Sequence, residues 1–225
     1  MRKIWNVRPL KSAQQQLLTA DLGISPIIAQ VLLNRGITTP QEARQYLHGG
    51  RNDVHDAFLL KDMDKAAARV RQAIARREPI VVYGDYDVDG LTSCALLFLV
   101  LRELGAQVSC YIPHRIDEGY GVNRDACVAI KKNNAALVIT VDCGISSFEE
   151  VEYLKAEGID VIVTDHHQPR EGKIPRALAV IDPFQEGCRY PYKELAGVGL
   201  AYKLAQAVAG ECCDVCEHLD LVALG

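Results

Sequence analysis

From residue 80 onward, short runs of aliphatic and β-branched residues alternate with longer stretches in which apolar residues recur at helical spacing. Short Val- and Ile-rich runs bounded by polar residues favour extended structure. They predict strands at 80–83, 108–112, 137–141, 161–164 and 178–181. The longer stretches predict helices at 91–104, 124–132, 148–157 and from 197 to about 208. This alternation predicts an α/β fold with a mostly parallel sheet of about five strands and helices on both faces.

Residues 1–60 lack the strand pattern and contain Gln-rich and Leu-rich segments that predict helices. Thr39-Pro40-Gln41-Glu42 has the form of a capping box and marks a helix that ends near Gly49. We therefore expect a helical N-terminal arm at 1–60 and an α/β metal-binding domain at 61–225. We expect a last helix to begin near Asp214. Its apolar pattern is still running at Gly225, so we expect this domain to be truncated at its C-terminal end.

Composition narrows the class of protein. The chain has 225 residues and a net charge of −4, which argues against broad adhesion to nucleic acid but leaves room for a local basic groove. Its apolar runs are too short to span a bilayer, so we expect no membrane association. Most of its cysteines lie inside predicted strands and helices, where free thiols pack as small apolar groups. We expect a cytoplasmic protein.

Three carboxylates occupy alternate positions where the first predicted strand ends. We expect Asp85, Asp87 and Asp89 to lie on the loop that leads into the next helix, which is where open α/β sheets bind ligands. Carboxylates crowded in a cleft repel one another, and a hard divalent cation neutralises them. An acidic turn or a helix cap would explain one aspartate but is a weaker explanation for three. The segment therefore predicts a metal site.

Two later strands repeat this pattern. The strand at 137–141 runs into Asp142, and the strand at 161–164 runs into Asp165-His166-His167. Because the carboxyl ends of parallel strands share one edge, we expect these side chains to join the aspartates. Mixed carboxylate and imidazole ligands suit Mn²⁺ or Mg²⁺ better than structural zinc. A bridging carboxylate would allow two ions, and such a pair, about 3.5–4 Å apart, supports phosphoester hydrolysis.

At this point the motifs resemble those of the DHH phosphoesterase superfamily and, within it, the RecJ type of single-stranded-DNA exonuclease. The motifs occur in order along the chain. They are Gly84-Asp85-Tyr86-Asp87-Val88-Asp89-Gly90-Leu91-Thr92, Ile112-Pro113-His114-Arg115, Glu118-Gly119-Tyr120-Gly121, Val141-Asp142-Cys143-Gly144, Asp165-His166-His167-Gln168 and Ala196-Gly197-Val198-Gly199.

The resemblance implies a 5′-to-3′ exonuclease that hydrolyses single-stranded DNA to mononucleotides in recombination and DNA repair. It implies Mn²⁺ or Mg²⁺ as cofactor, and single-strand-binding protein and a helicase as partners. By motif position, Asp87 and Asp89 are metal ligands, Asp142 bridges, and His166 binds the second ion. His167 either orients a ligand or contacts the scissile phosphate. Asp85 either binds metal or supports the residues that do.

The substrate side allows two interpretations for most of its residues. Arg115 either pairs with a phosphate or is a surface arginine. Tyr120 either stacks on a base or packs under a turn. The helix start at Gly197 and Gly199 offers backbone N–H groups to a phosphate.

Two other functions stay open. A phosphoesterase of the same fold would act on short oligonucleotides, cyclic dinucleotides or pyrophosphate, whereas a non-catalytic replication scaffold would be free to lose ligands. The resemblance also implies that such chains continue past Gly225 into a further metal-binding aspartate and a second domain. We therefore expect this chain alone to bind metal yet to be slow or inactive.

Overall fold

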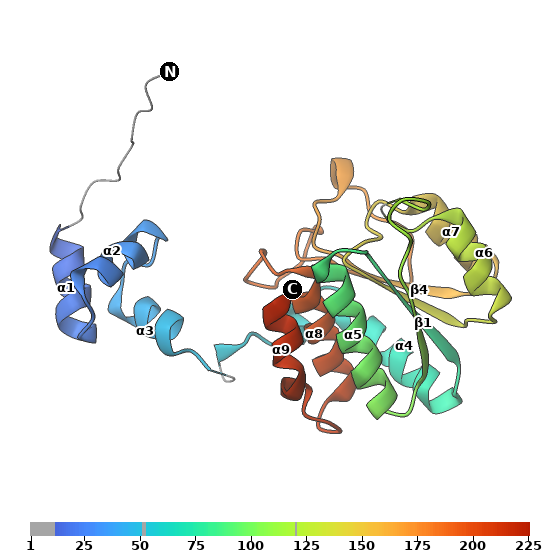
Figure 1. The fold of residues 1–225 in the computed structure, drawn as a ribbon, viewed down its shortest axis with the longest axis horizontal. Coiled ribbons are helices and arrows are strands. Elements are labelled where there is room, and N and C mark those ends of the chain that lie inside the picture. Colours follow the sequence, from blue (N-terminus) through green and yellow to red (C-terminus); the bar gives the residue numbers. More distant parts are fainter. Residues whose placement is uncertain (1–11, 51–52, 120) are drawn as a thin grey trace, which may run out of the picture. The chain divides into compact units, whose positions relative to one another are not determined.

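The computed structural model describes residues 12–50, 53–119 and 121–225 (Figure 1). The chain divides into two compact units, Met1–Val54 and His55–Gly225. Each unit has its own hydrophobic core.

The described residues of the N-terminal unit form helices. Its helices are α1 (Ser12–Leu22), α2 (Pro26–Asn34) and α3 (Pro40–His48). Thr39 and Glu42 form the predicted capping box at the start of α3. In the described part of the chain, no single helix is long and apolar enough to cross a membrane; α1 and α2 reach that length only as a pair bent by 119°.

The second unit is built on a five-stranded sheet in the order β2-β1-β3-β4-β5. Its strands are β1 (Pro79–Gly84), β2 (Gln107–Tyr111), β3 (Leu137–Val141), β4 (Asp160–Thr164) and β5 (Ala179–Ile181). Every neighbouring pair is parallel, and the register sets Val141 between Gly84 and Thr164. The predicted parallel α/β fold is confirmed, and β1, β3 and β4 end at the same level.

Helices cover both faces of the sheet (Figure 1). One face carries α4 (Met63–Arg76), α5 (Val88–Glu103), α8 (Gly197–Ala209) and α9 (Leu219–Leu224), and the other carries α6 (Arg124–Lys132) and α7 (Phe148–Ala156). Short 3₁₀ turns lie at Ala57–Leu59, Arg170–Gly172 and Val215–His218. Successive strand residues point to opposite faces of the sheet and pack into two separate hydrophobic cores. Val82 and Ile139 pack with α5 and α8, whereas Val81 and Val138 pack with α6 and α7.

The connections place a topological switch point at the carboxyl edge between β1 and β3. The chain leaves β1 through α5 on one face and returns from β2 through α6 on the other, so the direction of winding reverses beside β1. Such a switch point is where open α/β sheets bind ligands.

Two predicted helix boundaries were wrong. Helix α5 begins at Val88, three residues before the predicted start, because the Asp87 side chain accepts a hydrogen bond from Gly90 N and caps the helix early. Asp89 therefore lies in the first turn of α5 and not on the preceding loop. The last helix does not begin near Asp214, since a 3₁₀ turn precedes α9.

Candidate metal centre

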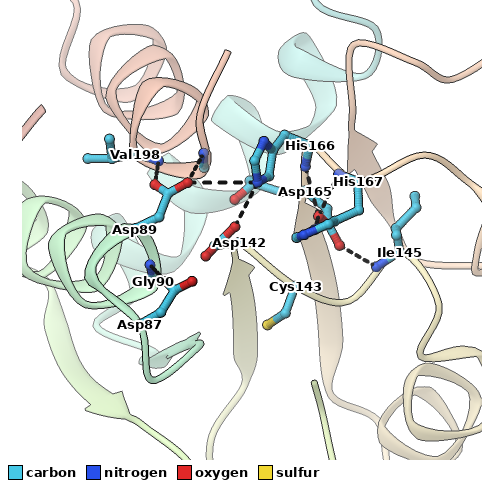
Figure 2. A network of polar contacts seen from close by, with 12 residues as sticks. Asp87, Asp89, Gly90, Asp142, Cys143, Ile145, Asp165, His166, His167 and Val198 are labelled. Carbon is cyan, nitrogen blue, oxygen red and sulfur yellow. Dashed lines mark hydrogen bonds and ion pairs between the residues drawn. The ribbon is translucent and has the colours of Figure 1, made fainter. Parts of the chain in front are cut away.

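The carboxyl ends of β1, β3 and β4 bring the predicted ligands together (Figure 2). Ligand oxygens of Asp85, Asp87 and Asp142 lie within 4.8 Å of one another. Ligand atoms of Asp142, His166 and His167 satisfy the same limit, so Asp142 belongs to both groups. An all-carboxylate group suits Mg²⁺ or Mn²⁺, and a carboxylate with imidazoles suits Mn²⁺. The donor set therefore fits the expected cations.

Asp142 is held at the centre of this arrangement by unusual backbone geometry. Its φ of 58° is left-handed, a conformation that costs energy in a non-glycine residue. The strand ends around it are tied together, because Thr140 Oγ1 donates to Cys143 O at 2.8 Å and Thr164 Oγ1 donates to Thr140 O at 2.8 Å. The turn thus directs a buried carboxylate toward His166, whose Nε2 lies 3.0 Å from Asp142 Oδ1.

The electrostatics of Asp142 favour a cation. Burial, together with the negative charges of Asp89 and Asp87, raises the pKa of Asp142 to about 6, although the hydrogen bond with His166 opposes this rise. The same hydrogen bond raises the pKa of His166. A divalent ion beside Asp142 would stabilise its charged form and relieve the repulsion.

Asp165 organises the histidine pair. Its Oδ1 accepts hydrogen bonds from the backbone N–H groups of His166 (2.8 Å) and His167 (3.0 Å), and it lies 2.7 Å from His167 Nδ1. Its Oδ2 accepts from Ile145 N at 2.9 Å, which ties the loop after β4 to the loop after β3. The contact with Asp165 raises the pKa of His167 to about 8. Asp165 therefore orients the His167 ring and favours its charged form.

Asp89 has a different setting from the other carboxylates. Its Oδ2 accepts a hydrogen bond from Gly197 N at 2.8 Å and its Oδ1 accepts one from Val198 N at 2.6 Å (Figure 2). The same Oδ2 lies 3.7 Å from His166 Nε2, and Asp89 belongs to neither of the two ligand groups. The helix start at Gly197 and Gly199, predicted to receive a phosphate, thus directs two N–H groups to Asp89.

The remaining predicted substrate residues lie on the β2–α6 connection. Arg115 is exposed, and its guanidinium carbon lies 5.3 Å from the centre of the Tyr86 ring. Tyr86 directly follows Asp85 in the chain. This stacking keeps Arg115 at the same edge of the sheet as the carboxylates. Tyr120 lies outside the described residues.

Comparison with known proteins settles the family. Residues 79–225 match the model of the DHH family, N-terminal domain. The chain belongs to the DHH family. It is 46% identical over 221 residues to the single-stranded-DNA-specific exonuclease RecJ of Bacillus subtilis, an alignment that covers 98% of this chain and 28% of that protein. The resemblance to this family predicted from the motifs is confirmed.

Two solved structures similar to this chain are complexes with a divalent cation. The chain is similar to Thermus thermophilus RecJ in complex with Mn²⁺, with a TM-score of 0.75, 30% identity, and coverage of 95% of this chain and 30% of that one. It is also similar to the Mg²⁺ complex from that organism, with a TM-score of 0.62, 28% identity, and coverage of 95% and 26%. This DHH chain therefore spans less than a third of the length of these relatives.

The DHH domain also contains a buried carboxylate that lies outside the sequence motifs. Asp182 directly follows β5 and is fully buried. Its Oδ1 accepts from Phe184 N at 2.7 Å, while its Oδ2 has no hydrogen-bond partner in the part of the chain that the structure describes. Burial, together with the nearby charge of Asp165, raises the pKa of Asp182 to about 7. The pattern of a strand followed by an aspartate, already used for β1 and β3, would have found it.

Proposed function

We propose that this DHH domain is the metal-binding catalytic part of a 5′-to-3′ exonuclease that hydrolyses single-stranded DNA to mononucleotides in recombination and DNA repair. The observation that carries the proposal is the position of Asp142, a buried carboxylate shared by two groups of ligand atoms. The RecJ names of the relatives support the substrate, and the Mn²⁺ and Mg²⁺ complexes support the cofactor.

In this proposal the ligand residues are divided between two metal ions. Asp85 and Asp87 would hold one ion and His166 the other, and Asp142 could contribute a ligand oxygen to both, since it belongs to both groups of ligand atoms. When bound, the pair of ions supplies an activated water and stabilises the oxygen that leaves phosphorus. Asp89, predicted to be a ligand, anchors α8 beside His166 and closes one wall of the site.

Two cationic side chains then contact the substrate. His167, oriented by Asp165 and with its pKa raised to about 8, is largely protonated at neutral pH and contacts the scissile phosphate. Arg115, steadied on the Tyr86 ring, pairs with a second phosphate oxygen. Single-strand-binding protein and a helicase are the proposed partners, and the cytoplasm is the proposed location.

The decisive experiment follows mononucleotide release from single-stranded DNA by the full gene product that carries this chain. We expect release that requires Mn²⁺ or Mg²⁺ and starts from the 5′ end, and that Asp142→Ala reduces to background. Asp125→Ala, which changes an exposed aspartate on α6, is the matched control and should cleave normally. If 5′-ended strands stay intact with both the parent and Asp142→Ala, the exonuclease assignment fails.

Two further measurements distinguish the exonuclease from the two alternative functions, a phosphoesterase with another substrate and a non-catalytic scaffold. Faster turnover of a cyclic dinucleotide, a short oligonucleotide or pyrophosphate than of single-stranded DNA would favour the second phosphoesterase assignment. Specific ligand binding stabilises the native state, so Mn²⁺ should raise the melting temperature of this chain. A melting temperature that does not respond to Mn²⁺ would favour a non-catalytic scaffold.

A further inference from the structure

A cavity of about 620 Å³ opens beside His167, on the α6–α7 side of the sheet edge. Its walls come from the loop before α6, the β3–α7 connection and the loop after β4. The lining residues that matter here are Val122, Ile145, Ser146, Ser147, His167 and Arg170. The cavity therefore shares His167 with the candidate metal centre, but Asp85, Asp87 and Asp142 do not line it.

Hydrogen bonds hold the cavity walls in place. Tyr83 OH donates to Gly121 O at 2.9 Å, which fixes the loop before α6. Ile145 N donates to Asp165 Oδ2 at 2.9 Å, which fixes the β3–α7 connection against the loop after β4. A cavity whose walls are tied in this way is formed before a ligand arrives, as small-molecule sites usually are.

The environment of Ser147 indicates that this cavity binds a ligand. It occupies the N-cap position of α7, yet its hydroxyl makes no capping hydrogen bond. The residue is only 8% exposed, and its hydroxyl has no hydrogen-bond partner in the part of the chain that the structure describes. Because Ser147 lines the cavity, its hydroxyl is free to hydrogen-bond a ligand group there. The first N–H groups of the nine-residue helix α7 also lack intrahelical acceptors and could donate to a ligand.

The chemistry of the walls indicates which ligand fits. Val122 and Ile145 supply apolar surface, which a phosphate alone would leave uncovered, whereas two serine hydroxyls and Arg170 supply donors. Glu150 and Asp165 also line the cavity and disfavour a ligand that carries only negative charge. A ligand with an apolar ring, several hydrogen-bonding groups and one phosphate satisfies all of these walls.

We infer that this cavity is a nucleotide subsite, which binds the sugar and base of the nucleotide whose phosphate lies at the metal centre. This inference rests on the proposed exonuclease function. Ser147 hydrogen-bonds the nucleoside, and Arg170 pairs with the adjoining phosphate. Apart from the His167 ring, no aromatic side chain lines the described part of the cavity, and we expect the subsite to accept any of the four bases.

The test measures binding of deoxythymidine 5′-monophosphate to this chain by calorimetry at saturating Mn²⁺. Ser146→Tyr fills the cavity from its exposed rim, and Ser147→Ala removes the unpartnered hydroxyl. We expect each to weaken nucleotide binding by at least about fivefold, the equivalent of one hydrogen bond, while the Mn²⁺ affinity stays unchanged. Ser109→Tyr, which adds the same ring to an exposed position on β2, is the matched control and should bind like the parent.

The possible failures are distinguishable. Parent-like nucleotide affinity in both Ser146→Tyr and Ser147→Ala, or no nucleotide binding by the parent, would overturn the subsite. Loss of nucleotide binding in the two variants, combined with a full gene product that cannot cleave DNA, would support the subsite and overturn only the exonuclease assignment. Thermal melts of each variant establish that a weakened affinity does not reflect unfolding.

Discussion

Gly197 packs so closely against Asp142 that residue 197 has no room for a side chain. A Cβ added to Gly197 would lie 2.7 Å from Asp142 Cβ and 2.9 Å from Asp142 Cγ, closer than real Cβ atoms approach. Neither partner can retreat easily, because Asp142 is buried and the Asp89 carboxylate anchors the start of α8. The glycine motif at this helix start therefore positions the shared carboxylate.

We predict that Gly197→Ala lowers the free energy of unfolding by about 1–3 kcal/mol, the usual cost of forcing an extra carbon into a packed site. It should also weaken Mn²⁺ binding, since Asp142 must shift. Gly199→Ala is the matched control, because its Cβ would lie 3.3 Å from the flexible Leu195 side chain. Urea unfolding and calorimetric Mn²⁺ titration measure both effects. Equal losses in the two variants would show that contact with Asp142 is not the cause.

Asp89 yields a prediction that separates a helix cap from a metal ligand. In metal-free protein, Asp89→Ala removes the acceptor of two backbone N–H groups and should cost about 0.5–2 kcal/mol of stability, the range for lost N-caps. A residue that served only as a ligand would behave oppositely, because removing its charge would relieve repulsion with Asp142.

Urea unfolding in the presence of a chelator measures this difference. Asp89→Asn, which keeps one acceptor oxygen and loses the charge, should lie between the parent and Asp89→Ala. An Asp89→Ala protein that is more stable than the parent would contradict the capping role.

The strands were predictable because the buried sheet imposes a local signal. Each of β1, β3 and β4 is a short apolar run with a polar residue directly after it, and the predicted bounds agree with the structure to within one or two residues. Parallel pairing then places the ends of those strands on one edge. That topology alone brings Asp142 and His166 together from positions 24 residues apart.

Contacts without a local pattern were not predictable. The hydrogen bond from Gly197 to Asp89 joins residues 108 positions apart, and no periodicity indicates that a metal-motif aspartate would cap a distant helix. The start of α5 was missed because Asp87 is both an acidic residue of the metal motif and the N-cap of the helix. The cavity beside Ser147 depends on three loops whose paths the sequence pattern does not encode.

Mn²⁺ binding should weaken as the pH falls. Ligands must be deprotonated to bind a metal. The pKa of Asp142, raised to about 6, and the raised pKa of His166 mean that protons compete with the ion in this range. We expect the affinity to rise from about pH 5.5 to about pH 8, with protons released on binding. Calorimetry in buffers of different ionisation enthalpy counts those protons. An affinity that is constant over this range, with no proton release, would contradict the assignment of these ligands.

Asp182 should make the metal-free protein less stable as the pH rises. Its pKa is raised to about 7 in the folded state, so between pH 4 and 7 the folded protein binds this proton more tightly than the unfolded chain. The stabilisation is complete below the ordinary pKa of an aspartate and is lost as the pH rises through about 7. Each pKa unit corresponds to about 1.4 kcal/mol, so the effect is measurable.

Asp182→Asn removes this titration and keeps the oxygen that accepts from Phe184 N. The buried amide has a constant cost of its own, which is why the slope with pH, and not the stability at one pH, is the informative quantity. We predict that the difference in unfolding free energy, variant minus parent, increases from about pH 4 to about pH 7 and then levels off. Urea unfolding with a chelator at several pH values gives this curve. Asp142 and the histidines are present in both proteins, so their own titrations largely cancel in the difference. A flat curve would mean that Asp182 is charged throughout.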